Sequence, residues 1–112
     1  IGSALAYALS CGIAVVRKPR KLPAATFSAS YALEYGTDTL EIHQDAFPAG
    51  SRVLVIDDLL ATGGTAEATI SLARQLRASV VEAAFMIELT FLNGRKRLAP
   101  CEVFSLVQYD SE

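Results

Sequence analysis

The chain has 112 residues, of which 52% are hydrophobic and 20% are charged, and its formal net charge is -2. This length predicts a single domain, 1–112, and the apolar content excludes intrinsic disorder, which requires low hydrophobicity and high net charge. Ten Lys and Arg against twelve Asp and Glu exclude a broadly cationic nucleic-acid binder, although a local basic patch stays possible. The two cysteines are too few for a disulfide scaffold and fit a reducing cytoplasm.

The N-terminal part of the sequence predicts a helix, a strand and a basic loop. Residues 3–11 are rich in helix formers, and Gly12 is placed to end that helix in a left-handed conformation. Residues 13–16 are rich in β-branched side chains and predict a short strand. Residues 17–23 combine cations with prolines, so we expect a loop there. The uncharged stretch 1–16 is shorter than the ~20 residues of a membrane-spanning helix.

Small, hydroxylic and aromatic residues then lead into a second strand. We expect residues 26–33 to be mobile and residues 36–38 to form a turn. Leu40 and Ile42 alternate with polar neighbours, which predicts a half-exposed strand over 39–43. Residues 47–50 predict another turn.

The centre of the sequence carries the clearest strand and helix signals. Residues 52–56 form a continuous apolar run, typical of a parallel strand that is buried on both faces. Residues 57–65 predict the loop that follows. Apolar residues then recur at helical spacing over 66–77, at Ala66, Ile70, Ala73 and Leu76.

The C-terminal part repeats the alternation of strand and helix. Residues 80–89 are a second apolar run, 92–95 predict a turn or short helix, and 103–107 predict a last strand. This alternation indicates an α/β fold with a mainly parallel twisted sheet flanked by helices. The first residue is Ile1 rather than Met, so we expect the chain to begin inside a longer protein. The opening helix should cross over from a preceding strand, and without that strand we expect one sheet edge to be uncovered.

The loop after the central strand predicts a phosphate site. Gly63 and Gly64 allow the backbone to approach a ligand closely. The free N–H groups at the start of the following helix suit a phosphate, and Thr62 and Thr65 add hydroxyl donors. No Gly-Lys-Ser/Thr follows, so the loop is not a Walker A motif.

Two acids stand where the central strand ends. Asp57 and Asp58 can accept hydrogen bonds from sugar hydroxyls or organise Mg²⁺. A phosphate beside two carboxylates requires a ligand with a neutral or cation-forming part between them, and a ribose 5-phosphate meets this requirement. Carboxylates near the anomeric carbon would also stabilise positive charge that develops there during a reaction.

Residues 53–65 resemble the PRPP-binding motif of the type I phosphoribosyltransferases. The wider chain resembles the adenine phosphoribosyltransferase branch of that family, with matching segments at 17–23, 30–36, 88–89 and 104–106. The resemblance implies a type I phosphoribosyltransferase-like fold that lacks its N-terminal portion, including part of the adenine pocket. It also implies a cytoplasmic homodimer that makes AMP and pyrophosphate from adenine and PRPP, with Mg²⁺ held through PRPP and water rather than directly by the protein.

The resemblance further implies roles for individual residues. Glu34 and Tyr35 would lie on a mobile loop that closes over the reacting centre, with Glu34 handling the purine proton, and Asp57 and Asp58 would hold the ribose hydroxyls. The pyrophosphate would face Arg17, Lys18 and Lys21, and the 5′-phosphate would be bound by Ala61, Thr62, Gly63, Gly64 and Thr65.

Two other functions compete with this interpretation. A PRPP-sensing regulator would keep the phosphate loop but could lose Glu34 and the cations of 17–23, and both are present. A phospho-acceptor receiver domain also has an acidic pair in a doubly wound fold, but it leaves the Gly-Gly-Thr sequence unexplained.

Overall fold

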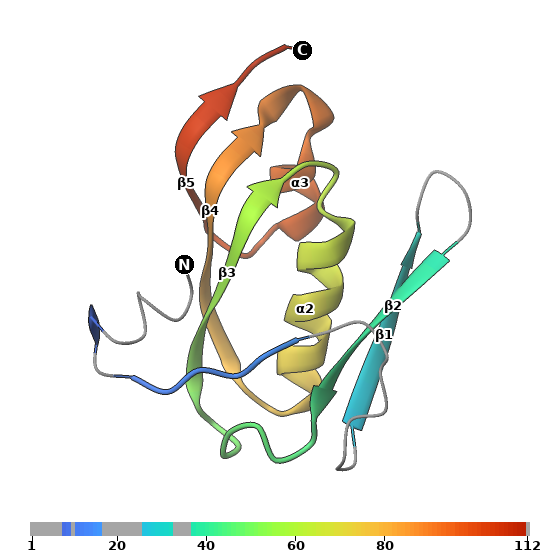
Figure 1. Ribbon diagram of the computed structural model, residues 1–112, viewed down its shortest axis with the longest axis vertical. Coiled ribbons are helices and arrows are strands. Elements are labelled where there is room, and N and C mark those ends of the chain that lie inside the picture. The colour runs from blue at the N-terminus through green and yellow to red at the C-terminus, as the bar shows by residue number, and fades with distance from the viewer. Residues whose placement is uncertain (1–7, 10, 17–25, 33–36, 112) are drawn as a thin grey trace.

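The computed structural model of the chain describes residues 8–9, 11–16, 26–32 and 37–111, and a three-stranded parallel sheet lies at its centre. The strands follow the order β3 (Arg52–Leu60), β4 (Ser79–Leu89) and β5 (Val103–Tyr109). Because all three run in the same direction, their carboxyl ends meet at one edge of the sheet (Figure 1). The α/β class and the parallel sheet are therefore confirmed.

Short helices make the connections between these strands. Helix α2 (Gly64–Gln75) joins β3 to β4, and the 3₁₀ turn η1 (Thr90–Leu92) with helix α3 (Gly94–Leu98) joins β4 to β5. The short helix expected near 92–95 is confirmed. Both connections leave the carboxyl edge of the sheet, so the start of α2 and the start of α3 lie near each other (Figure 1).

A hairpin forms a separate small sheet. Strand β1 (Thr26–Ala32) pairs antiparallel with β2 (Thr37–His43), from Thr26 opposite His43 to Ala32 opposite Thr37. The expected strand at 39–43 is confirmed. Residues 26–32, which the sequence analysis expected only to be mobile, form a regular strand, since antiparallel pairing supplies backbone hydrogen bonds that their composition does not predict.

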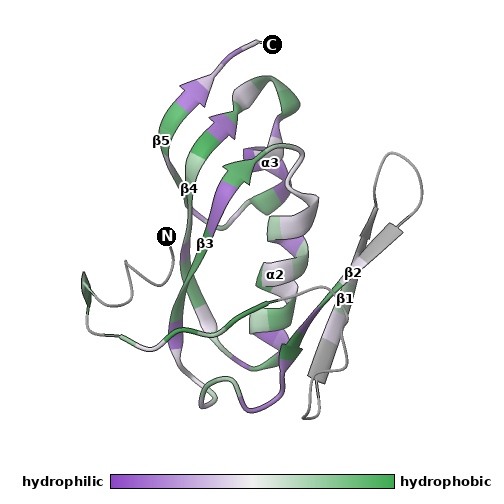
Figure 2. Cartoon of the chain, in the orientation of Figure 1, coloured by the Kyte–Doolittle hydropathy of each residue, from purple (hydrophilic) through white to green (hydrophobic). Residues whose placement is uncertain are grey.

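Helix α2 is buried on two sides and separates the sheet from the hairpin. Ala66 and Ile70 pack with Val55, Ala83 and Phe85 of the sheet. Ala68, Leu72 and Leu76 pack instead with Leu40 and Ile42 of the hairpin. The molecule therefore has three layers, in which α2 lies between the two sheets, and hydrophobic residues recur along α2 and the central strands (Figures 1 and 2).

The N-terminal prediction was wrong in two details. Residues 11–16 form no regular element, because a strand needs a hydrogen-bonded neighbour and 13–16 pair with none of the described strands. Gly12 does not take a positive φ, unlike Gly50 and Gly63. Val16 nevertheless packs against the cluster between α2 and the hairpin.

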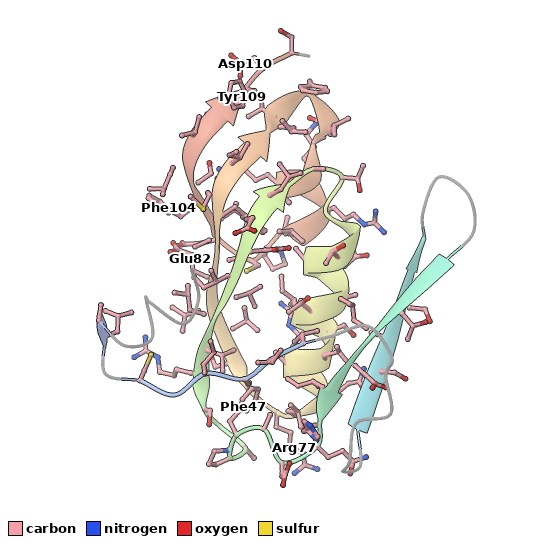
Figure 3. The ribbon with its side chains drawn as sticks, viewed as in Figure 1. Phe47, Arg77, Glu82, Phe104, Tyr109 and Asp110 are labelled. Atoms are coloured by element: carbon pink, nitrogen blue, oxygen red, sulfur yellow. The ribbon has the colours of Figure 1, made fainter. Side chains whose placement is uncertain are left out.

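One face of the central sheet is open, so the expectation that 52–56 is buried on both faces was wrong. Val55 is 7% exposed and faces α2, whereas its neighbour Leu54 is 41% exposed. Phe104 and Leu106 on β5 are also exposed, and Phe104 points away from α2 (Figure 3). Within the described residues, β3 pairs only with β4 and forms a sheet edge, as expected.

None of the helices in the described part of the chain combines the length and apolar character needed to cross a membrane.

Replacing Leu72 by Ala tests the three-layer packing. Leu72 lies on α2 and is fully buried against the hairpin. Its truncation should therefore lower the free energy of unfolding by about 2–5 kcal/mol, which urea denaturation would measure. Leu106→Ala is the control, because Leu106 is 66% exposed and its truncation should cost less than about 1 kcal/mol. Equal losses for the two variants would contradict the packing described.

Candidate functional site

The two acids of the predicted site lie within the last part of β3. The strand continues to Leu60, so Asp57 and Asp58 are residues of the strand rather than of the loop predicted to begin at 57. Both side chains are exposed, and the backbone N–H of Asp58 donates to Oδ1 of Asp57 at 2.8 Å. They therefore stand at the carboxyl edge of the sheet, where ligands of α/β proteins bind.

The loop between β3 and α2 consists of Ala61, Thr62 and Gly63. Gly63 has φ 92° and ψ 0°, a left-handed conformation that side chains rarely adopt, and it reverses the chain into α2. Its carbonyl oxygen accepts the backbone N–H of Glu67 at 2.8 Å, which begins the helix. The sequence requirement for glycine at this position thus comes from backbone geometry.

The N-terminus of α2 has no side-chain cap among the described residues. The first four N–H groups of a helix have no partner within it, and no side chain caps this end in the described part of the chain. Thr62 and Thr65 on either side of the glycines are exposed, so their hydroxyls are accessible. The positive end of the helix dipole adds a favourable field for an anion.

Helix α3 packs closely against the loop. A Cβ atom added to Gly63 would lie 3.0 Å from the carbonyl oxygen of Gly94 and 3.3 Å from Cβ of Arg97. A Cβ atom added to Gly94 would overlap the carbonyl oxygen of Ala61 and lie 2.9 Å from Cδ1 of Leu60. The two backbones approach so closely that both positions require glycine.

The structure brings seven of the predicted site residues together at one edge. These are Asp57, Asp58, Ala61, Thr62, Gly63, Gly64 and Thr65. Arg17, Lys18, Lys21, Glu34 and Tyr35 lie outside the described residues, so their roles stay predictions. Across the described part of the chain, no three His, Cys, Asp or Glu side chains group as metal ligands.

Glu88, at the carboxyl end of β4, is a residue of this edge to which the sequence analysis gave no role. Its side chain is 4% exposed and pairs with the Arg95 guanidinium at 2.6 Å. The hydrogen bonds from Arg95 hold the pKa of the Glu88 carboxyl below its ordinary value, against the opposing effect of burial. The sequence did carry a signal for this residue: Glu88 is a charged residue near the end of the apolar run 80–89, where a charge is unusual unless it is paired.

A shallow groove of about 430 Å³ lies on another flank, between α2 and α3, and includes Ser71, Gln75 and Ala99 in its lining. None of the described residues of the predicted site is among those that line it.

Comparison with known proteins agrees with this geometry. The phosphoribosyl transferase domain model matches residues 1–108. The chain belongs to the phosphoribosyltransferase family.

Relatives within the family share both the sequence and the backbone. The chain is 56% identical over 109 residues to the adenine phosphoribosyltransferase of Trichlorobacter lovleyi, covering 97% of this chain and 64% of the relative. The crystal structure of the adenine phosphoribosyltransferase from Thermoanaerobacter pseudethanolicus superposes with a TM-score of 0.94 at 53% identity, covering 96% of this chain and 63% of that one.

A yeast structure shows what one family member binds. The adenine phosphoribosyltransferase of Saccharomyces cerevisiae, crystallised with an imino-altritol bisphosphate and adenine, superposes with a TM-score of 0.90 at 48% identity, covering 94% of this chain and 59% of that one. The chain thus spans about two thirds or less of the length of these relatives.

Two glycine substitutions test the contact between the loop and α3. Gly50 and Gly63 both have positive φ, but a Cβ atom on Gly50 would meet nothing within 4 Å. Gly50→Ala should therefore lower the free energy of unfolding by about 1 kcal/mol, through backbone strain alone. Gly63→Ala should lower it by about 2–4 kcal/mol, because overpacking against Gly94 adds to the strain.

Urea denaturation of the two variants measures the difference. Equal losses would show that the backbone of α3 can withdraw from the loop without cost, and would contradict the close packing.

Proposed function

We propose that this chain is the PRPP-binding core of an enzyme that transfers the 5-phosphoribosyl group from PRPP to adenine, giving AMP and pyrophosphate in purine salvage. The observation that carries the proposal is the uncapped N-terminus of α2, which follows a left-handed Gly63 and lies beside two exposed acids. The naming of the relatives as adenine phosphoribosyltransferases supports the choice of adenine.

The loop would bind the 5′-phosphate of the substrate. Backbone N–H groups at Gly63, Gly64 and Thr65 and the hydroxyls of Thr62 and Thr65 are donors of the kind that a phosphate accepts. The narrow spacing between the loop and Gly94 keeps these donors in a fixed arrangement before the ligand arrives. A fixed arrangement lowers the entropy cost of binding.

The acids would bind the pentose and assist the reaction. Asp57 and Asp58 can each accept hydrogen bonds from ribose hydroxyls, which orients the sugar. In the transfer, a purine nitrogen bonds to the anomeric carbon, the bond from that carbon to the pyrophosphate oxygen breaks, and a proton leaves the purine. The two carboxylates would stabilise the positive charge that develops at the anomeric carbon.

Residues outside the described ranges would complete the site. Arg17, Lys18 and Lys21 would neutralise the pyrophosphate, whose departure requires positive charge nearby. Glu34 and Tyr35 would close over the reacting centre, where Glu34 accepts the purine proton and water is excluded.

The donor set fits a magnesium ion that is bound together with the substrate. Carboxylate oxygens, phosphate oxygens and water are the ligands that Mg²⁺ prefers, and Asp57 and Asp58 offer exposed carboxylates next to the phosphate loop. The ion would neutralise the charge of the pyrophosphate group. We place this enzyme in the cytoplasm as a homodimer, as the family resemblance suggests.

Adenine-dependent release of pyrophosphate from PRPP tests the proposal. The full-length protein should release pyrophosphate with adenine and much more slowly with guanine, hypoxanthine or xanthine. PRPP binding without release by any base would favour the alternative, a PRPP-sensing regulator. No PRPP binding by calorimetry would contradict both functions.

Replacing both acids by amides tests their chemical role. Asp57→Asn with Asp58→Asn should lower kcat/KM by about 100-fold or more, because charge stabilisation at the sugar is lost. The free energy of unfolding should change by less than about 0.5 kcal/mol, since both side chains are exposed. Asp45→Asn is the control at another exposed acid and should leave kcat/KM unchanged. A large loss of stability with intact turnover would assign the acids a structural role.

A further inference from the structure

Glu88 is the one buried charged side chain in the described part of the chain, and the proposed reaction does not use it. It lies in the register position next to Leu60, the last residue of β3 before the phosphate loop. Burying a charge is unfavourable unless the charge is fully paired. We therefore ask which contacts compensate the burial of Glu88 at the carboxyl end of the sheet.

The Glu88 carboxylate collects donors from two elements. Arg95 on α3 donates through Nη2 to Oε1 at 2.6 Å and through Nε to Oε2 at 3.2 Å, a forked pair with a fixed geometry. Ser105 and Gln108 on β5 donate to Oε1 at 2.8 Å and 3.3 Å. Arg95 also donates through Nη1 to the carbonyl oxygen of Val103 at 2.8 Å. The carboxylate therefore fixes the position of Arg95 relative to β4 and β5.

Arg95 immediately follows Gly94, the residue whose backbone lies against the phosphate loop. The carbonyl oxygen of Gly94 would be 3.0 Å from a Cβ atom on Gly63, and Gly94 itself packs against Ala61 and Leu60. A shift of α3 toward or away from β4 would therefore change the space behind the loop. The position of the loop depends on the position of α3, and the latter depends on the Glu88–Arg95 pair.

A second ion pair joins the other end of α3 to the helix that follows the loop. Arg97 donates through Nε to Oε1 of Glu67 at 3.1 Å, and Glu67 lies in the first turn of α2. These side chains are 34% and 52% exposed, so both partners of this pair face solvent. In the first pair Arg95 is 46% exposed and only the Glu88 carboxylate is buried. Helix α3 is thus tied to β4 through two hydrogen bonds from Arg95 to Glu88, and to α2 through one from Arg97 to Glu67.

We propose that Glu88 is a positioning residue for phosphate binding, which acts through Arg95 and Gly94 to hold the loop of Ala61–Gly63 in the conformation that accepts the 5′-phosphate. This inference rests on the proposed function of that loop. The Glu88 carboxylate is buried and bonded to Arg95, Ser105 and Gln108, so we expect it to act through α3 rather than on a ligand. Its removal should therefore weaken binding of the sugar phosphate and leave adenine binding unaffected.

Glu88→Gln is the direct test, because it keeps the shape of the side chain and removes its charge. In the full-length protein it should raise the Kd for ribose 5-phosphate and the KM for PRPP by about tenfold or more, as displacement of a binding group does. The KM for adenine should change less than twofold. Glu102→Gln, the same change at an exposed glutamate before β5, is the matched control and should leave all three constants unchanged.

Leu72→Ala separates positioning from general destabilisation. It removes a buried contact between α2 and the hairpin, away from the loop, and should lower stability without changing the Kd for ribose 5-phosphate. If Leu72→Ala and Glu88→Gln raise that Kd equally, the effect of Glu88 is only structural and the proposal is overturned. Unchanged affinity in folded Glu88→Gln would also overturn it.

Two further variants decide the matter if Glu88→Gln does not fold. Arg95→Lys keeps the positive charge but cannot make the two parallel hydrogen bonds of the guanidinium to the Glu88 carboxylate. Gly94→Ala should push α3 away from the loop without changing any charge. Both should weaken ribose 5-phosphate binding selectively, and wild-type affinity in both would overturn the proposal. Failure of the wild-type protein to bind ribose 5-phosphate or PRPP would instead refute the proposed function itself.

Discussion

Gly63 takes a left-handed backbone conformation, with φ 92° and ψ 0°, and this single reversal sets the direction in which α2 leaves β3. The first N–H groups of α2 have no partner within the helix, and no side chain in the described part of the chain caps them. A residue with a Cβ atom would strain the backbone and press on Gly94. The anion binding that we propose for the site would therefore come from backbone geometry, with the hydroxyls of Thr62 and Thr65 as further donors.

The rest of the fold keeps this reversal in place. Parallel pairing of β3, β4 and β5 aligns their carboxyl ends, so residues far apart in sequence meet behind the loop. Packing on both sides of α2 prevents that helix from turning about its axis, since Ile70 contacts the sheet and Leu72 contacts the hairpin side. Helix α3 then packs directly against the loop, and the ion pair between Arg95 and the buried Glu88 carboxylate joins α3 to β4. Under the proposed function, recognition of the sugar phosphate would therefore depend on contacts made outside the loop as well as within it.

Sequence patterns predicted the elements whose signals are local. The apolar run 52–56, the glycine pair at 63–64 and the alternation of Leu40 and Ile42 located β3, the phosphate loop and β2. Strand β1 was missed because its pairing with β2 is a tertiary property that its small residues do not encode. Residues 13–16 have strand composition but no paired neighbour in the described chain. The support from Gly94 and Glu88 could not be predicted, because it requires knowing that β4, β5 and α3 end beside the loop.

The central claim is that a sugar phosphate binds to the backbone amides at the start of α2. Titration of the ¹⁵N-labelled protein with ribose 5-phosphate, followed through its backbone amide resonances, tests this claim most directly. The account predicts that the largest shifts belong to Thr62, Gly63, Gly64 and Thr65 and saturate together with those of Asp57 and Asp58. Saturable shifts confined to another surface, or no shifts at these amides at millimolar ligand, would contradict it.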